Sequence, residues 1–170
     1  TESSEFFNSC SFSKWSTDTQ RSAHFSLAES IGHGCFAYSS FLLTNGYPPD
    51  GLDGAADTLR MACMRPRNAL VELLLQHRAT CDVHLTDRVV DDAAHGLPNT
   101  MKTVELLLAS KALPSALALI KLAKSPDRSS LEVLQACQNG GVQLTARGLL
   151  HWAGSRETVR LLVAANCDVD

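Results

Sequence analysis

An apolar run recurs along the chain at a regular interval. Its copies are residues 71–75 (VELLL), 104–108 (VELLL) and, in a weakened form, 159–163 (VRLLV). The offset between the first two copies, from Val71 to Val104, is typical of stacked helical units, each of which is too small to bury its own apolar face. The pattern therefore favours an all-α helical repeat solenoid, an architecture that offers a recognition surface without identifying a partner.

Turn-forming residues divide the chain from residue 25 onward into about five helix-turn-helix units. We expect the shorter first helices near residues 27–31, 58–64, 89–95, 116–124 and 148–153. We expect the second helices, which carry the leucine-rich runs, near 36–43, 69–77, 101–110, 130–137 and 157–165. Asn68 is a suitable N-cap for the helix that follows it. The units that result are approximately 25–56, 57–88, 89–115, 116–145 and 146–170.

Residues 1–24 differ from the rest of the chain. Ten of them are Ser or Thr, yet Phe6, Phe7, Phe12 and Trp15 are interspersed. Each large aromatic side chain can remove roughly 150–250 Å² from water if it finds a surface, so a simple linker is not the expected structure. We expect this segment to cap the first unit; an arm that docks another subunit and a disordered segment are the alternatives.

The helical units resemble degenerate ankyrin repeats. Val159, Leu161, Leu162 and Val163 followed by residues 166–170 (NCDVD) are similar to the second helix and the close of that repeat, and residues 149–153 (LLHWA) and 59–63 (LRMAC) are similar to its opening. No unit carries the intact Thr-Pro-Leu-His opening of the family. The resemblance covers residues 25–170, and another kind of helical solenoid is the alternative.

Each unit of such an array is expected to end in a residue with left-handed backbone. We expect these residues to be Gly46, Arg78, Lys111, Asn139 and Asn166. The intervals that end at Asn139 and Asn166 are shorter than the two that precede them. The last two units are therefore expected to be shortened.

Composition limits the classes of partner. The chain has 170 residues, a formal net charge of −3 and a pI of about 6.0, so we expect neither direct nucleic-acid binding nor attachment to an acidic membrane. Six scattered cysteines, several of them within apolar runs, favour reduced thiols and an intracellular location in the cytoplasm or nucleus. A disulfide scaffold is the alternative. Because the chain does not begin with Met, we expect it to be part of a longer protein.

Candidate chemistry is sparse. Cys81 and His84 form a Cys-x-x-His pair, but a zinc site needs two further ligands at comparable spacing. Asp91 and Asp92 suggest an acid–base cluster with Asp87 and His95, yet adjacent helical residues do not face each other. The chain contains no nucleophile elbow, phosphate loop or dinucleotide fingerprint. We expect no catalytic residue, no cofactor and no metal.

The resemblance implies a protein or peptide partner on the inner helices and finger tips of the array. Carried over position by position, this surface includes the following residues: Arg60, Met64, Asp91, His95, Lys121, Lys124, His151 and Trp152. Trp152 is the strongest candidate, because tryptophan is enriched at binding hot spots; a packed core position is its alternative. The basic residues of the second unit, either a solvated face or a site for an acidic peptide, are Arg60, Arg65, Arg67, His77 and Arg78.

These observations favour a non-catalytic interaction module or scaffold that holds a protein or peptide on a concave groove. The alternative is a regulatory or substrate-recruiting domain of a larger enzyme or signalling protein. The oligomeric state stays open at this point.

Overall fold

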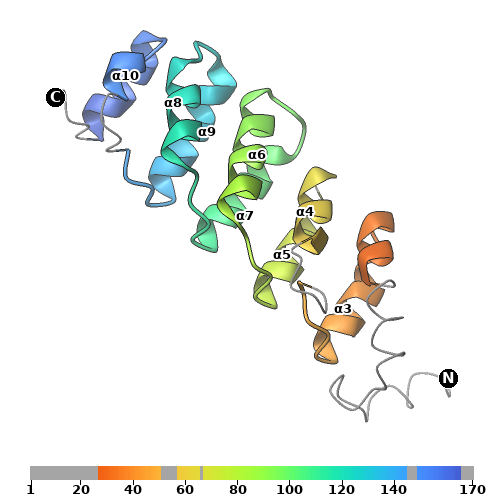
Figure 1. The fold of residues 1–170 in the computed structure, drawn as a ribbon. Helices are drawn as coiled ribbons and strands as arrows, with labels where there is room; N and C mark the ends of the chain where they lie inside the picture. Colours follow the sequence, from red (N-terminus) through yellow and green to blue (C-terminus); the bar gives the residue numbers. More distant parts are fainter. Residues whose placement is uncertain (1–26, 51–56, 66, 145–148, 166–170) are drawn as a thin grey trace, which may run out of the picture. The chain divides into compact units, whose positions relative to one another are not determined.

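The structure is a computed structural model that describes residues 27–50, 57–65, 67–144 and 149–165. Within these residues it contains helices and turns and no β-strand (Figure 1). The predicted all-α class is therefore confirmed for the described part of the chain. The expectations for residues 1–24 and for Asn166 lie outside the described residues.

The chain divides into two compact units, Thr1–Thr80 and Cys81–Asp170. In the first unit, residues 27–33 are helical. They are followed by α3 (Phe36–Thr44), α4 (Asp57–Met64) and α5 (Asn68–Gln76). Helix α5 contacts both α3 and α4, and Leu59, Leu70 and Leu74 are fully buried or nearly so in this unit.

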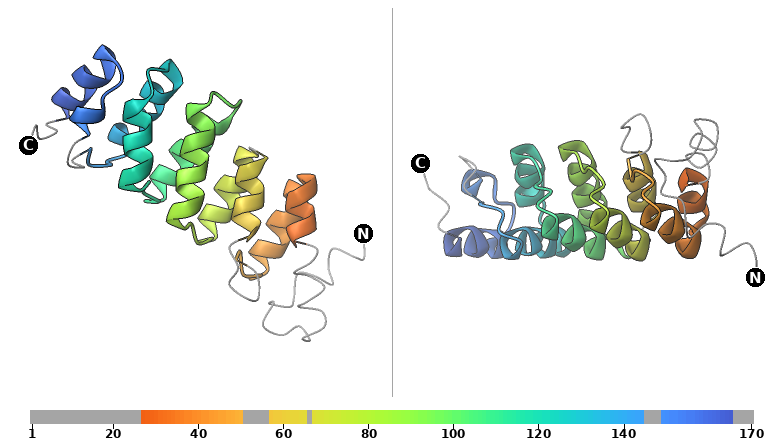
Figure 2. Two further views of the ribbon diagram at one scale, coloured as in Figure 1. Left: turned by 45° about the horizontal axis from the view of Figure 1, so that its top comes forward. Right: turned by 90° about the horizontal axis from the view of Figure 1, so that it is seen from below.

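The second unit contains five α-helices and one 3-10 helix within its described residues. They are α6 (Val83–Ala94), α7 (Thr100–Ala109), α8 (Ala116–Lys124), α9 (Arg128–Asn139), η2 (Leu150–Trp152) and α10 (Arg156–Ala164). In the right-hand view of Figure 2, α6 and α8 lie in one layer and α7, α9 and α10 lie in another. Among the described residues of the whole chain, no helix combines the length and the apolar character needed to cross a bilayer.

Three of the differences from the predicted element boundaries matter most. Helix α6 begins at Val83 rather than Val89, because the Asp82 carboxylate accepts a hydrogen bond from the Leu85 N–H at 2.6 Å and caps an earlier start. The expected division between residues 88 and 89 therefore falls inside this helix. Asn68 is the first residue of α5 and not its cap. The helix expected at 148–153 is a 3-10 turn at Leu150–Trp152 in its described part.

One backbone arrangement ends six of the described helices. At the ends of the second helices, the residues with left-handed backbone are Gly46, Arg78, Lys111 and Gly141, with φ of +88°, +66°, +66° and +82°. After each of them, the next N–H donates to the carbonyl five residues earlier, in the Schellman arrangement. These bonds run from Tyr47 to Leu42 (3.1 Å), Ala79 to Leu74 (2.9 Å), Ala112 to Leu107 (3.0 Å) and Val142 to Cys137 (3.0 Å). Gly34 and Gly96 end two first helices in the same way, with bonds from Cys35 to Ser30 (2.8 Å) and from Leu97 to Asp92 (3.3 Å).

The position of the left-handed residue after α9 corrects one prediction. Asn139 is the last residue of α9, and Gly141 adopts the left-handed conformation in its place. The interval from Lys111 to Gly141 is still shorter than the interval from Arg78 to Lys111. The shortening is smaller than the sequence suggested, because the left-handed residue, Gly141, lies beyond Asn139.

Many buried side chains come from positions that the apolar pattern predicts, although Val159 and Val163 of the third run are exposed. Val71, Leu74, Leu107 and Leu162 are each no more than 1% exposed, and burial of such a side chain contributes roughly 1.5–3 kcal/mol. Small residues of the first helices, Ala62, Cys63, Ala93 and Ala123, are buried as well. Cys35, Cys63, Cys81 and Cys137, the cysteines in the described residues, are free thiols.

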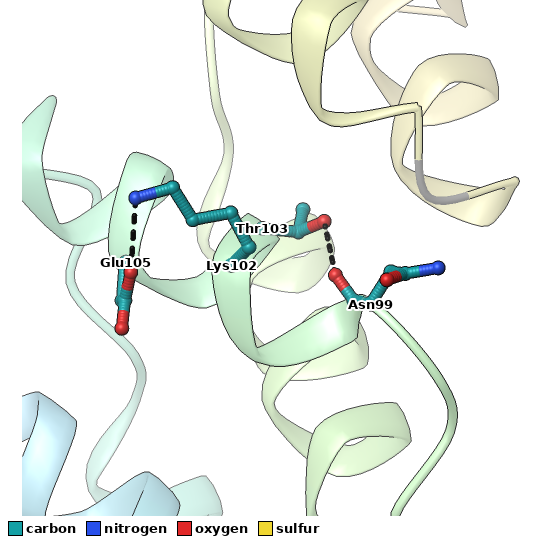
Figure 3. A network of polar contacts seen from close by, with 4 residues as sticks. All are labelled: Asn99, Lys102, Thr103 and Glu105. Carbon is teal, nitrogen blue, oxygen red and sulfur yellow. Dashed lines mark hydrogen bonds and ion pairs between the residues drawn. The ribbon is translucent and has the colours of Figure 1, made fainter.

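Helix α7 starts from a left-handed residue of its own, Asn99, with φ of +65° (Figure 3). The Thr103 hydroxyl donates to the Asn99 carbonyl oxygen at 3.5 Å, at the limit of a hydrogen bond. On the solvent side of the same helix, Lys102 Nζ lies 3.1 Å from Glu105 Oε2. An exposed ion pair of this kind contributes little to stability, so substitutions on this face suit a control.

The turn after η2 lies directly against the backbone at the end of α8. The Gly154 N–H donates to the Ala123 carbonyl oxygen at 2.7 Å. A Cβ atom added at Gly154 would overlap the carbonyl oxygen of Lys124. Because this oxygen belongs to the backbone, it cannot move away by a change of rotamer as a side-chain atom could.

We therefore expect Gly154→Ala to lower the free energy of unfolding by about 1–3 kcal/mol, a cost typical of overpacking. Chemical denaturation followed by circular dichroism measures this change. Gly141→Asn is the matched control, because space around Gly141 is open and Asn tolerates left-handed backbone. Equal stability of Gly154→Ala and wild type would show that the turn does not pack as described.

Candidate functional site

Helices α6 and α8 each present one polar face to solvent. Because Asp82 fixes the start of α6, His84, Arg88, Asp91 and His95 follow at helical spacing and all four are exposed. On α8, Leu117, Lys121 and Lys124 are likewise exposed at i, i+4 and i+7, whereas Leu119, Leu122 and Ala123 are buried. The two helices contact each other, which places their exposed faces side by side.

A pocket of about 470 Å³ lies between these faces, and we call it the α6–α8 pocket. Three of the predicted partner-binding residues, Asp91, His95 and Lys121, line it together. Sequence reasoning missed other lining residues, namely His84, Asp87, Arg88, Leu117 and Asp127. His84, Asp87 and Arg88 were not predicted as partner-binding residues because α6 was expected to begin only at Val89.

Most charges around the pocket are already engaged within the fold. Asp87 accepts hydrogen bonds from the Ser115 N–H (2.7 Å) and from the Ser115 hydroxyl (2.6 Å). Asp127 accepts from the Ser125 hydroxyl at 2.9 Å, and Arg88 lies 3.8 Å from Asp92. These side chains therefore stabilise the fold and are not fully available to a partner.

Asp91 and Lys121 differ from the other charged groups of the pocket. Neither side chain makes a hydrogen bond or ion pair with another described residue. His95 Nδ1 lies 2.7 Å from the carbonyl oxygen of Asp91, so its contact is to the backbone and not to the carboxylate. The Asp91 side chain therefore does not form an acid–base pair with His95, in line with the doubt that the helical spacing raised about such a cluster.

Trp152 stands at the end of α8 with its ring held on two sides. Lys124 Nζ lies 3.9 Å from the ring centroid, and the His151 ring meets the indole edge-on at a centroid distance of 5.4 Å. The side chain is 43% exposed, so Trp152 is not a packed core aromatic. These contacts bring together three more of the predicted partner-binding residues, Lys124, His151 and Trp152. The cation–π contact with Lys124 contributes about 0.5–1 kcal/mol at an exposed position.

Arg60 and Met64, the remaining predicted residues, lie on α4 in the first unit, and both are exposed. Two members of the basic set beside them have structural contacts. Arg65 Nη1 donates to the Gly32 carbonyl oxygen at 3.0 Å, and Arg67 Nη1 donates to that of Ile31. Because they satisfy carbonyls at the end of the helix at 27–33, these two guanidinium groups are not a free face for an acidic peptide.

Two of the described thiols, Cys81 and Cys137, are poor nucleophiles, and the described residues offer no metal centre. Burial raises the pKa of Cys137 to about 11. Burial also raises the pKa of Cys81, where a hydrogen bond to Thr86 acts in the opposite direction. Both thiols therefore stay protonated at neutral pH. No group of three or more His, Cys, Asp or Glu side chains in the described residues is placed to hold a metal ion.

Comparison of the chain with protein-family models, with curated proteins and with solved structures found no match. Its function therefore has to be inferred from the surface itself. That surface joins a pocket of mixed charge to an exposed, positioned tryptophan. Such an arrangement is suited to binding another molecule by contacts to side chains.

The two aspartates of the α6–α8 pocket are expected to differ in their effect on stability. Asp87→Ala leaves the N–H and hydroxyl of Ser115 without their carboxylate and should lower the free energy of unfolding by about 1–3 kcal/mol. Asp91→Ala, the matched control, removes a carboxylate with no described partner and should leave stability nearly unchanged. Urea denaturation of both variants measures the difference. An equal effect of the two substitutions would contradict these assignments.

Proposed function

We propose that the chain is a degenerate ankyrin-like repeat domain that binds another protein without catalysing a reaction. The partner lies on the exposed faces of the first helices of successive pairs. In the second unit this surface consists of the α6–α8 pocket and the neighbouring Trp152 with Lys124. The described cysteines are all free, which supports a reducing, intracellular location.

The repeated helix ends support the repeat architecture. At the ends of the second helices, the same left-handed conformation and the same hydrogen bond recur at similar intervals, at Gly46, Arg78, Lys111 and Gly141. Within the second unit, α6 contacts α8 and α8 contacts η2, while α7 contacts α9 and α9 contacts α10. Contacts between equivalent elements of neighbouring pairs are typical of repeat arrays.

The single observation that carries the proposed function is the exposed, fixed position of Trp152. The backbone N–H of Trp152 donates to the Leu149 carbonyl oxygen at 3.2 Å, and the backbone N–H of Gly154 connects the same turn to α8. A side chain that is already positioned loses little conformational entropy when a partner covers it. Exposed apolar area beside a pocket of mixed polarity also matches the composition of protein interfaces.

A photo-crosslinking amino acid at position 117 tests this function. Leu117 lines the α6–α8 pocket and is 64% exposed, whereas Gln135 is an exposed residue of α9 outside that pocket and serves as the control position. In an extract of cells that produce the protein, we expect a protein adduct from position 117 and not from position 135. Trp152→Ala should reduce the adduct at least about fivefold.

Equal adduct yields from the two positions would contradict the proposal. So would a position-117 adduct whose yield is unchanged by Trp152→Ala. Turnover of a small substrate by the chain alone would contradict its non-catalytic character.

A further inference from the structure

We propose that the occupant of the surface along α8 is a protein segment in which acidic side chains flank an apolar one. We call this surface the α8–η2 patch and define it as Leu117, Lys121, Lys124 and Trp152. This inference rests on the proposed function and adds the chemistry of the partner. It is carried by the charges on α8, by the apolar groups beside them and by the neighbouring carboxylates.

The charges of α8 are all positive. Its sequence, ALALIKLAK, contains Lys121 and Lys124 and no acidic residue. Elsewhere in the second unit, Arg88, Lys102 and Arg128 each pair with a carboxylate three or four residues later in the chain. The two α8 lysines form no ion pair with another described residue, so their charges are available to an incoming carboxylate.

Apolar groups lie at the two ends of this positive strip. Leu117 is 64% exposed one helical turn before Lys121, and Trp152 is 43% exposed with Lys124 Nζ at 3.9 Å from its ring. Covering such side chains removes apolar area from water, which favours a partner with an apolar residue of its own. The α6–α8 pocket next to Leu117 has about 470 Å³, enough to accept that residue.

The carboxylates nearby favour a short acidic segment over nucleic acid. An exposed tryptophan beside two lysines also resembles a platform on which a base of a single strand can stack. However, Asp91 and Asp127 line the adjoining pocket, and the whole chain carries a net charge of −3. A continuous phosphate backbone would meet these charges, whereas a peptide can place its acids on the lysines and another group near Asp91.

Fluorescence anisotropy with labelled synthetic peptides and the full 170-residue chain tests the inference. The probes are a peptide with Glu residues around a central Leu, its counterpart with Lys for Glu, its counterpart with Ser for Leu, and a single-stranded oligouridine. We expect the Glu–Leu peptide to bind at least about tenfold more tightly than each of the other probes, and added salt to weaken its binding.

Charge reversal on the protein is the matched measurement. Lys121→Glu combined with Lys124→Glu should weaken binding of the Glu–Leu peptide at least about tenfold and favour the Lys peptide. The control is Lys102→Glu combined with Lys111→Glu, which makes the same net change at exposed residues of α7 and its end and should have little effect. If the double variant does not fold, Lys121→Met removes one charge, keeps the aliphatic stem and should still weaken binding severalfold.

Several outcomes would overturn the inference. Equal weakening by both charge-reversal pairs would show that net charge alone attracts the peptide. Equal binding of the Glu and Lys peptides, lost in Trp152→Ala, would overturn the acidic partner and leave the proposed function intact. Tighter binding of oligouridine would assign the patch to nucleic acid. If no peptide binds, the acidic segment is ruled out, and crosslinking from position 117 decides the proposed function separately.

Discussion

One kind of backbone hydrogen bond, which recurs at the ends of the second helices, supports much of this structure. A residue in left-handed backbone turns the chain, and the N–H of the next residue closes back on the carbonyl five positions earlier. Three of the four residues that donate this bond also enter the core, since Tyr47, Ala79 and Val142 are each no more than 8% exposed. The bond therefore satisfies a helix-end carbonyl and sets the direction of the next segment at the same time. In the second unit the outcome is that α6 and α8 share one layer (Figure 2).

The surface follows from this placement. Because Val90 and Ala93 of α6 and Leu119 and Leu122 of α8 are buried, the opposite faces of both helices carry the polar side chains. Asp87 links the two helices through the N-cap residue Ser115, which in turn accepts a hydrogen bond from the Ala118 N–H at 3.2 Å. The groups that hold the site together are thus distinct from Lys121, Lys124 and Trp152, which stay available to a partner.

Sequence reasoning found the elements whose apolar pattern was strong and missed those fixed by single polar contacts. It placed the helix at 116–124 with the observed bounds, because Ser115 and Ser125 flank a largely apolar segment that contains no glycine or proline. It began α6 too late, although Asp82 is a common N-cap residue type and Leu85 and Val89 follow it at helical spacing. At residues 139–141, three consecutive turn formers left the choice of the left-handed residue undetermined. The contacts of Arg65 and Arg67 reach far back along the chain, to Gly32 and Ile31, a separation over which local pattern carries no information.

Amide hydrogen exchange resolved by residue tests the shared helix end most directly. The account predicts that the N–H groups of Tyr47, Ala79, Ala112 and Val142 exchange at least about a hundredfold more slowly than in an unstructured peptide, as hydrogen-bonded amides in packed elements do. Exchange of these four amides at unstructured rates, while the helices before them stay protected, would contradict it.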